Sequence, residues 1–286
     1  FLFFLVDDMG WADIGANGST FHETPNIDRL AKSGMRFTQG YAAGSVCSPT
    51  RASIMTGRHP VRVDITDWIP GQANPPANPL LHPEDRSHLP LEEVTIAEAL
   101  KEHGYQTFFA GKWHLGDKGQ WPTDQGFDIN IGGTSYGGPP SFFSPYRNAT
   151  LPDGEPGEYL PDRLVDEAIG FIRDHKARPW MVHLWFYTVH WPMQAPESLL
   201  KKYAERTGPG LNDTRYGAMI EAMDLAVGRL LASLEALGLD DETLVVFTSD
   251  NGGFAGVSDC RPLRESKGHL YEGGIRVPMI GRWPGR

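Results

Sequence analysis

Runs of apolar residues mark five expected strands along the chain. Residues 1–6 are apolar throughout, and residues 105–110, 180–187, 244–249 and 275–280 also have the composition of strands. An unbroken apolar run such as 1–6 is typical of a central strand that is buried on both faces, because parallel sheets are covered on both sides.

Helical patterns separate these runs. Residues 24–34 read as a short capped helix, and Thr95 with Glu98 forms a capping box for a helix that extends to Gly104. Residues 161–175 and 212–237 carry apolar side chains at helical spacing. Strands alternating with helices over 286 residues predict an α/β fold, as one large domain or two smaller ones.

Two long stretches lack a regular pattern. Residues 61–90 are rich in Pro, Asn and His, and we expect them to form one wall of a substrate pocket, because a loop this long is usually functional or mobile. Residues 130–161 combine Gly and Pro with Tyr136, Phe142, Phe143 and Tyr146. This second stretch is either a specificity loop that stacks on a sugar or aromatic ring, or a packed surface loop.

Polar residues follow directly after four of the expected strands. They are Asp7 and Asp8, Lys112 and His114, His190, and Asp250 and Asn251. Ligands of open parallel sheets bind in the crevice at the carboxyl ends of the strands, so we expect these side chains to meet there. The simpler interpretation is solvated turns and surface residues.

The acidic members of this set indicate a cation. Adjacent carboxylates at Asp7 and Asp8 are costly to bury unless a cation or several donors stabilise them. Together with Asp250 and Asn251 they form an all-oxygen set, which suits Ca²⁺, with Mg²⁺ as the alternative, rather than Zn²⁺.

Residues 44–58 read as a loop that enters a helix. Ser48 is a suitable N-cap and Pro49 a suitable first helical residue, which would put Cys47 just ahead of the helix at its positive end. Arg51 lies four residues further on, toward the same side. A cysteine in this setting is expected to be a good nucleophile or a modified residue, although a buried, packed cysteine is the simpler alternative.

Composition narrows the choice of function. Apolar residues make up 40% and charged residues 22% of the chain, as in soluble globular proteins. The net charge of −10 argues against nucleic acid as a partner, and no apolar run is long enough to span a membrane. Cys47 and Cys260 are the two cysteines, so a disulfide framework is excluded if Cys47 is catalytic.

Four motifs carry a family resemblance. Residues 47–51 (Cys-Ser-Pro-Thr-Arg), followed by Ala-Ser-Ile-Met-Thr-Gly-Arg, resemble the signature of the type I sulfatases, in which the cysteine becomes formylglycine. Residues 111–116 (Gly-Lys-Trp-His-Leu-Gly) resemble the second signature, and the segments around His190 and Lys267 are similar to two further active-site segments. Membership implies the fold of the alkaline phosphatase superfamily, with a large, mostly parallel mixed sheet sandwiched between helices.

The resemblance also implies which residues act. The expected metal ligands are Asp7, Asp8, Asp250, Asn251 and the modified Cys47, and the expected catalytic residues are Cys47, Arg51, Lys112, His114, His190 and Lys267. Asn251 stands where the phosphatases of the superfamily would have a histidine, which favours one hard cation.

The implied reaction is hydrolysis of a sulfate ester, with saccharide sulfates preferred and aryl sulfates also accepted. One hydroxyl of the hydrated formylglycine attacks sulfur, and the other later expels sulfate. Arg51 and Lys112 would steady the diol and the transferred group. His190 and Lys267 would neutralise the departing alkoxide, and His114 would take a proton from the second hydroxyl.

Three alternatives stay open at this point. The first is a phosphonate monoester or phosphodiester hydrolase with the same formylglycine and metal. The second is an unmodified cysteine enzyme, and the third is a binding protein that keeps the pocket without catalysis.

The resemblance further implies that residues 1–286 are the catalytic, N-terminal domain and that a smaller C-terminal domain of the family is absent from this chain. The chain begins inside an apolar run without an initiator Met, so we expect the N-terminus to be missing. A maturation enzyme that generates formylglycine is the expected partner. A periplasmic, secreted or lysosomal location is the expected compartment.

Overall fold

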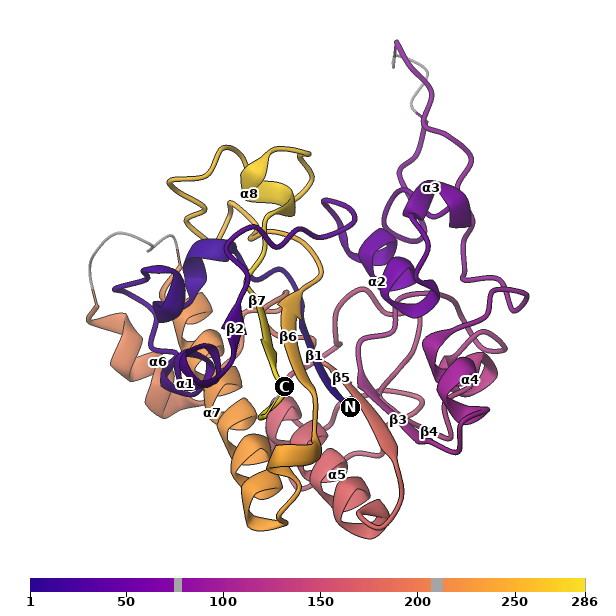
Figure 1. The fold of residues 1–286 in the computed structure, drawn as a ribbon. Coiled ribbons are helices and arrows are strands. Elements are labelled where there is room, and N and C mark those ends of the chain that lie inside the picture. Colours follow the sequence, from indigo (N-terminus) through magenta and orange to yellow (C-terminus); the bar gives the residue numbers. More distant parts are fainter. Residues whose placement is uncertain (75–78, 207–212, 286) are drawn as a thin grey trace.

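The computed structural model describes residues 1–74, 79–206 and 213–285. These residues build one seven-stranded sheet with the strand order β2-β7-β6-β1-β5-β3-β4. The strands are β1 (Leu2–Val6), β2 (Met35–Arg36), β3 (Gln106–Gly111), β4 (Ile129–Ile131), β5 (Trp180–Trp185), β6 (Val245–Ser249) and β7 (Met279–Arg282). Figure 1 shows the sheet between two groups of helices, which is the layered α/β arrangement that we expected.

β1 is the centre of the sheet. It pairs in parallel with β5, Leu2 opposite Val182, and with β6, Leu2 opposite Val245. β3 and β4 continue the parallel part beyond β5, whereas β7 is antiparallel to β6 and β2 is antiparallel to β7. The sheet is therefore mixed but mostly parallel, and its parallel strands all end at one edge.

Two hydrophobic cores cover the two faces of this sheet. Leu2, Phe4 and Val6 of β1 point into the larger core, and Leu5 points into the smaller one. Successive strand residues point to opposite faces of the sheet, so a strand that is apolar throughout contributes side chains to both cores. This is why residues 1–6 are apolar throughout.

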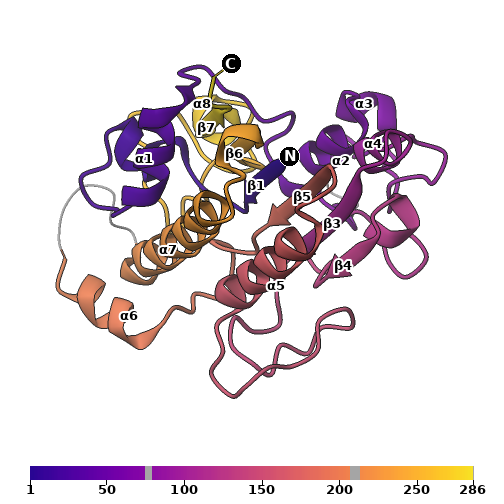
Figure 2. The ribbon, with the colours of Figure 1, turned by 60° about the horizontal axis from the view of Figure 1, so that its bottom comes forward.

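The helices divide between the two faces (Figures 1 and 2). On the larger core lie α1 (Pro25–Ser33), α5 (Leu160–His175) and α7 (Thr214–Ala236). On the smaller core lie α2 (Cys47–Thr56), α3 (Pro60–Val63) and α4 (Ile96–Lys101). The remaining helices are α6 (Glu197–Ala204) and α8 (Glu272–Ile275), with short 3₁₀ turns η1 (Trp11–Asp13), η2 (Gly15–Asn17), η3 (Pro122–Gln125) and η4 (Asp240–Glu242).

The expected elements are present, with shifts at their ends. The capping box at Thr95 and Glu98 is confirmed, with the Thr95 hydroxyl accepting the Glu98 amide at 3.2 Å. The strand expected at 275–280 begins only at Met279, because Ile275 closes the short helix α8. The helix expected over 212–237 is α7, and its expected start at residue 212 lies outside the described residues.

The start of α2 differs from the expectation. The helix begins at Cys47 with Val46 as N-cap, so Ser48 and Pro49 already lie in its first turn. The Ser48 hydroxyl does not cap the helix; it donates to the His114 carbonyl at 3.1 Å and accepts the Ile69 amide at 3.0 Å. Ser48 thus ties the helix to two loops, which overrides its local preference for the N-cap.

His183 of β5 makes the unfolding free energy of the protein depend on pH. Burial lowers the pKa of His183 to about 3, and the ring stacks on Phe3 at 5.1 Å between centroids. His183 is harder to protonate in the folded protein than in the unfolded chain, so the unfolding free energy is highest above pH 6.5. It decreases as the pH falls from 6.5 toward the folded-state pKa of about 3. Between pH 7.5 and 5, protonation of His183 in the unfolded chain should lower the unfolding free energy of the wild type by about 2 kcal/mol. We expect this contribution to be absent in His183→Phe.

Urea unfolding of both proteins at the two pH values measures this difference. The exposed His103, changed to Gln, is the matched control and should leave the pH dependence of wild type unchanged. Equal losses of stability in wild type and His183→Phe would contradict the assignment.

Candidate active site

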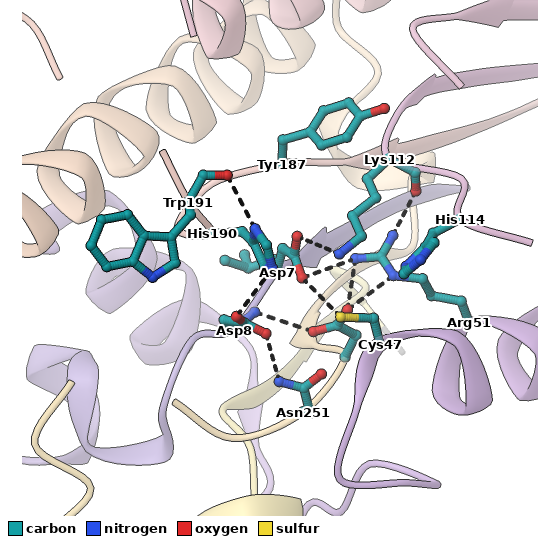
Figure 3. Close-up of polar contacts among 12 residues, drawn as sticks. Asp7, Asp8, Cys47, Arg51, Lys112, His114, Tyr187, His190, Trp191 and Asn251 are labelled. Carbon is teal, nitrogen blue, oxygen red and sulfur yellow. Dashed lines mark hydrogen bonds and ion pairs between the residues drawn. The ribbon is translucent and has the colours of Figure 1, made fainter. Parts of the chain in front are cut away.

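The polar residues expected at the strand ends meet at the carboxyl edge of the sheet (Figure 3). Asp7 and Asp8 follow β1, Asp250 and Asn251 follow β6, and His190 follows β5 by a short turn. β3 delivers Lys112 and His114, the first turn of α2 delivers Cys47 and Arg51, and the loop before α8 delivers Lys267. All ten residues are thereby brought together from six separate segments.

Asp7 is at the bottom of the site and is fully buried. Its carboxylate accepts the Lys112 ammonium at 2.7 Å and lies 3.7 Å from the Cys47 sulfur. Burial alone would raise the pKa of Asp7, but the positive charges of Lys112, His190 and Arg51 outweigh it and hold the pKa well below its usual range. Asp7 is therefore an anion in the folded protein.

Arg51 joins α2 to β6 through a buried ion pair. Its Nε and Nη2 both donate to Asp250 Oδ2, at 2.9 and 2.7 Å, and Nη1 donates to the Lys112 carbonyl at 2.5 Å. The guanidinium also lies over the Trp185 ring, 5.4 Å from its centroid. Burial, and the nearby Asp7 carboxylate, raise the pKa of Asp250 to about 6 against the opposing charge of Arg51.

Asp8 faces the opposite side of the site. Its carboxylate accepts Lys267 Nζ at 2.7 Å and Asn251 Nδ2 at 2.8 Å, and His190 Nε2 lies 3.8 Å away. The Asp8 backbone has a φ of 62°, in the left-handed region that non-glycine residues rarely adopt. Surrounding contacts must hold this conformation, and they orient the carboxylate toward the site.

Tyr216 of α7 supplies one of these contacts, and the sequence alone did not reveal it. Its single hydroxyl hydrogen is shared between Asp13 Oδ2 at 2.6 Å and the Asp8 carbonyl at 3.1 Å. Asp13 also accepts the Gly10 amide at 2.7 Å and the Ser258 hydroxyl at 3.0 Å. A tyrosine in a helical stripe is indistinguishable from an ordinary core residue until the packing of α7 is known.

His114 is a buried histidine of the site. Its Nε2 lies 2.6 Å from the Ile69 carbonyl, and the buried Nδ1 has no hydrogen-bond partner among the described residues. Burial, with the charges of Lys112 and Arg51, holds the pKa of His114 well below its usual value. The imidazole is therefore neutral at physiological pH and has a ring nitrogen that can accept a proton.

Cys47 is not the activated thiol that its helix position predicted. Burial raises the pKa of its thiol to about 12, even though Lys267 Nζ lies 3.4 Å from the sulfur. Desolvation outweighs the favourable end of the helix, because the thiol is buried next to the carboxylates of Asp7 and Asp250. Both cysteines are free, so Cys47 is not bridged to Cys260.

The site fits a hard cation. Asp7, Cys47 and Asp250 each offer a ligand atom within 4.8 Å of the others, and all three are buried. The Asn251 Oδ1 is also buried and has no hydrogen-bond partner among the described residues, because Nδ2 makes the contacts to Asp8 and Gly252. A buried acceptor without a donor, beside carboxylates, is a suitable ligand for Ca²⁺ or Mg²⁺.

A cavity of about 730 Å³ opens above Cys47. Trp68, Ile69 and Pro70 line it, so the expectation that residues 61–90 form one wall is confirmed for this part; residues 75–78 lie outside the described residues. The second stretch contributes Tyr136, but Phe142 and Tyr146 are buried in the larger core. Most of its aromatic residues therefore pack the fold and do not face a substrate.

Two further aromatic residues of the cavity were not expected as binding residues. Trp191 follows His190, and Phe254 follows the two glycines after Asn251. Both stay partly exposed at the mouth of the cavity. Their position in the sequence next to predicted catalytic residues could have indicated that they line the cavity. Their orientation, however, depends on how the loops fold.

The family model named Sulfatase matches residues 1–286, and the chain belongs to this family. It is 36% identical to human arylsulfatase A, over 98% of this chain and 58% of that protein. It is 34% identical to the dog N-acetylgalactosamine-6-sulfatase, over 100% of this chain and 57% of that protein. The chain thus spans less than three fifths of these relatives.

A solved structure, Ps i-CgsB in complex with k-i-k-neocarrahexaose, superposes with a TM-score of 0.85 at 32% identity, over 99% of this chain and 65% of that one. The expected fold class is confirmed. Within the described ranges, no helix is both long and apolar enough to cross a membrane.

Loss of the Tyr216 hydroxyl should destabilise the protein. Tyr216→Phe removes the hydroxyl that contacts the Asp8 carbonyl and one of the donors to the buried Asp13 carboxylate, which keeps the Gly10 amide and the Ser258 hydroxyl, so we expect a loss of about 2–3 kcal/mol in unfolding free energy. The control is Tyr159→Phe, which removes one hydrogen bond to the Gln194 carbonyl and none to Asp8 or Asp13. That control should lose about 1 kcal/mol in the same urea titration. Equal losses would contradict a special role for Tyr216.

Proposed function

We propose that this protein hydrolyses sulfate esters through a formylglycine derived from Cys47 and a bound divalent cation. The observation that carries the proposal is the position of Cys47 at the bottom of the cavity, between Asp7 and Lys267, in a chain of the sulfatase family. The high pKa of the thiol also makes an unmodified cysteine a poor nucleophile at neutral pH.

Asp7, Asp8, Asp250 and Asn251 would hold the cation, together with an oxygen of the modified residue 47. Ca²⁺ is the preferred ion and Mg²⁺ the alternative, because every donor is oxygen. When bound, the ion would polarise a sulfate oxygen and lower the pKa of the attacking hydroxyl. The hydrated formylglycine would supply that hydroxyl and a second one, whose deprotonation frees the sulfate.

The charges of the site support an anionic substrate. The carboxylates of Asp7, Asp8 and Asp250 are balanced by Arg51, Lys112 and Lys267 in direct contacts. A divalent cation would therefore leave the site with excess positive charge. That excess would bind a sulfate group and stabilise the charge that develops during its transfer.

The remaining residues would position the nucleophile, stabilise charge and accept a proton. Arg51 is fixed by Asp250 and would hold the nucleophile, and Lys112 would steady the same group from the side of Asp7. His190 and Lys267 both lie beside Asp8 and would neutralise the departing alkoxide oxygen. The neutral His114 would accept the proton of the second hydroxyl.

Carbohydrate sulfates are the preferred substrate class, with aryl sulfates as test substrates. The relatives include enzymes named N-acetylgalactosamine-6-sulfatase and arylsulfatase A, and the similar structure holds a neocarrahexaose. We infer that the chain corresponds to the catalytic domain of the family. Activity would require a formylglycine-generating enzyme, and we propose a periplasmic, secreted or lysosomal location by resemblance to the family.

The function is tested by the chemistry of residue 47. Conversion to formylglycine lowers the mass of the Cys47 peptide by about 18 Da, a change distinct from the oxygen additions of ordinary thiol oxidation. Sulfate release from 4-nitrophenyl sulfate should fall by about three orders of magnitude or more in Cys47→Ala. The matched control, Cys260→Ala, should keep wild-type turnover, because the Cys260 sulfur contacts the Gly253 carbonyl and the Ser258 hydroxyl, neither of which belongs to the ten predicted site residues.

Other outcomes would indicate other functions. Preferential turnover of a phosphodiester would indicate a phosphodiester hydrolase, and activity with an unmodified Cys47 would indicate a thiol enzyme. Ligand binding without any turnover by the modified protein would indicate a binding protein.

Cation binding can be tested separately. We expect Asn251→Ala to raise the Kd for Ca²⁺ in calorimetry by about tenfold or more, because it removes a ligand oxygen and the donor that orients Asp8. Asn17→Ala is the control, since Asn17 makes surface contacts to Arg36 and Trp11. An unchanged Kd in Asn251→Ala would remove this residue from the ligand set.

A further inference from the structure

Four aromatic side chains surround the mouth of the cavity above Cys47. They are Trp68, Tyr136, Trp191 and Phe254, and they come from four separate segments. Their exposed fractions are 38%, 41%, 44% and 41%, whereas Phe142 and Tyr146 of the same predicted specificity loop as Tyr136 are buried. Apolar ring faces are therefore left open at a cavity that the predicted nucleophile Cys47 also lines. We call these four residues the aromatic rim.

The cavity wall carries little charge beyond the catalytic residues. Among its described lining residues, the charged or titrating groups are Asp8, Cys47, His114, His190 and Lys267, all of which belong to the site already described. Gln72 and Ser135 are the neutral polar residues of the lining, and the remainder are aromatic, aliphatic, proline or glycine. The lining thus has no arginine, and its one lysine is already paired with Asp8.

One cation does lie behind the rim. The Arg215 guanidinium is 5.8 Å from the centroid of the Trp191 ring. It is paired with Asp213 through Nη2 at 2.7 Å and Nε at 3.0 Å, so its charge is balanced in place. Arg215 is not part of the cavity lining, and it supports the orientation of the Trp191 ring.

We propose that this cavity selects a sulfate ester whose sulfated ring carries no second anionic group. The ring would stack on the aromatic rim while its single sulfate reaches Cys47. This inference rests on the proposed function and narrows its substrate class from sulfate esters in general to neutral, singly sulfated rings.

The selectivity has two physical sources. The ring C–H groups of a sugar or the face of an aryl group gain contact with exposed aromatic faces. A second sulfate or a carboxylate would lose hydration inside the cavity without meeting a free cation, and it would face the negative quadrupole of the aromatic rings. The net charge of −10 adds repulsion at long range.

The first test compares two substrates that differ by one charge. We expect kcat/KM for 4-nitrophenyl sulfate to exceed that for 3-carboxy-4-nitrophenyl sulfate by about tenfold or more, the equivalent of one desolvated and uncompensated contact. Gln72→Lys should narrow this ratio by placing a cation in the wall, and Gln72→Glu should widen it. A ratio that neither variant changes would overturn the proposal.

The second test addresses the aromatic rim. Tyr136→Ala and Trp191→Ala should each raise KM for 4-nitrophenyl sulfate about three- to tenfold with little change in kcat, because stacking acts on binding. Trp191→Phe should restore most of the affinity. Trp283→Ala is the control, since Trp283 is similarly exposed but lines a different cavity, beside Phe1 and Trp180. Unchanged KM in both alanine variants would contradict the role of the rim.

Binding measurements separate this inference from the proposed function. Calorimetry on the Cys47→Ala protein with Ca²⁺ present compares N-acetylgalactosamine 6-sulfate with its 4,6-disulfate. Tighter binding of the monosulfate supports the inference even if the wild-type protein releases no sulfate, in which case the proposed function alone fails. Equal binding of the two sugars, or binding of neither, overturns the inference even if sulfate is released from other esters.

Discussion

The buried ion cluster around Arg51, Asp7 and Asp250 is the constraint on which the site depends. Asp7, Arg51, Lys112 and Asp250 are all fully buried, and an uncompensated charge at any of them would be very unfavourable. Each compensating partner comes from a different segment: Asp7 from β1, Asp250 from β6, Lys112 from the end of β3 and Arg51 from α2. The chain can bury one of these charges only by bringing the others to it, so folding and site assembly are one process.

The parallel sheet makes this assembly possible. β1, β3, β5 and β6 run in the same direction, so the residues that follow them emerge at one edge. Strand pairing holds their backbones in fixed register. A site built in this way is preorganised, because its charged groups need little rearrangement when a substrate arrives.

The floor and the mouth of the cavity have different physical characters. The floor is a dense network of charged groups at fixed distances, which suits chemistry on an anionic group. The mouth consists of exposed aromatic faces on loops, which suits recognition of a ring without charge. The proposed chemistry and the proposed ring recognition therefore rest on different residues, since Trp68 and Phe254 take no part in the ion pairs of Asp7 and Arg51.

The sequence by itself determined five of the seven strands that the structure describes, the helices α1, α2, α4, α5 and α7, and the polar residues that meet at the sheet edge. The short strands β2 and β4 were not predicted. Unbroken apolar runs such as residues 1–6 identify buried strands because both faces must be covered, and the motifs around Cys47 and His114 identify the family. Only the tertiary structure decided that Phe142 and Tyr146 are buried in the core, whereas Trp191 and Phe254 remain partly exposed. It also decided that burial keeps the Cys47 thiol protonated. The contact between the Tyr216 hydroxyl and the Asp8 backbone likewise depends on how α7 packs. Local periodicity reports which residues are apolar, whereas burial, pKa and long-range hydrogen bonds depend on segments far apart in the chain.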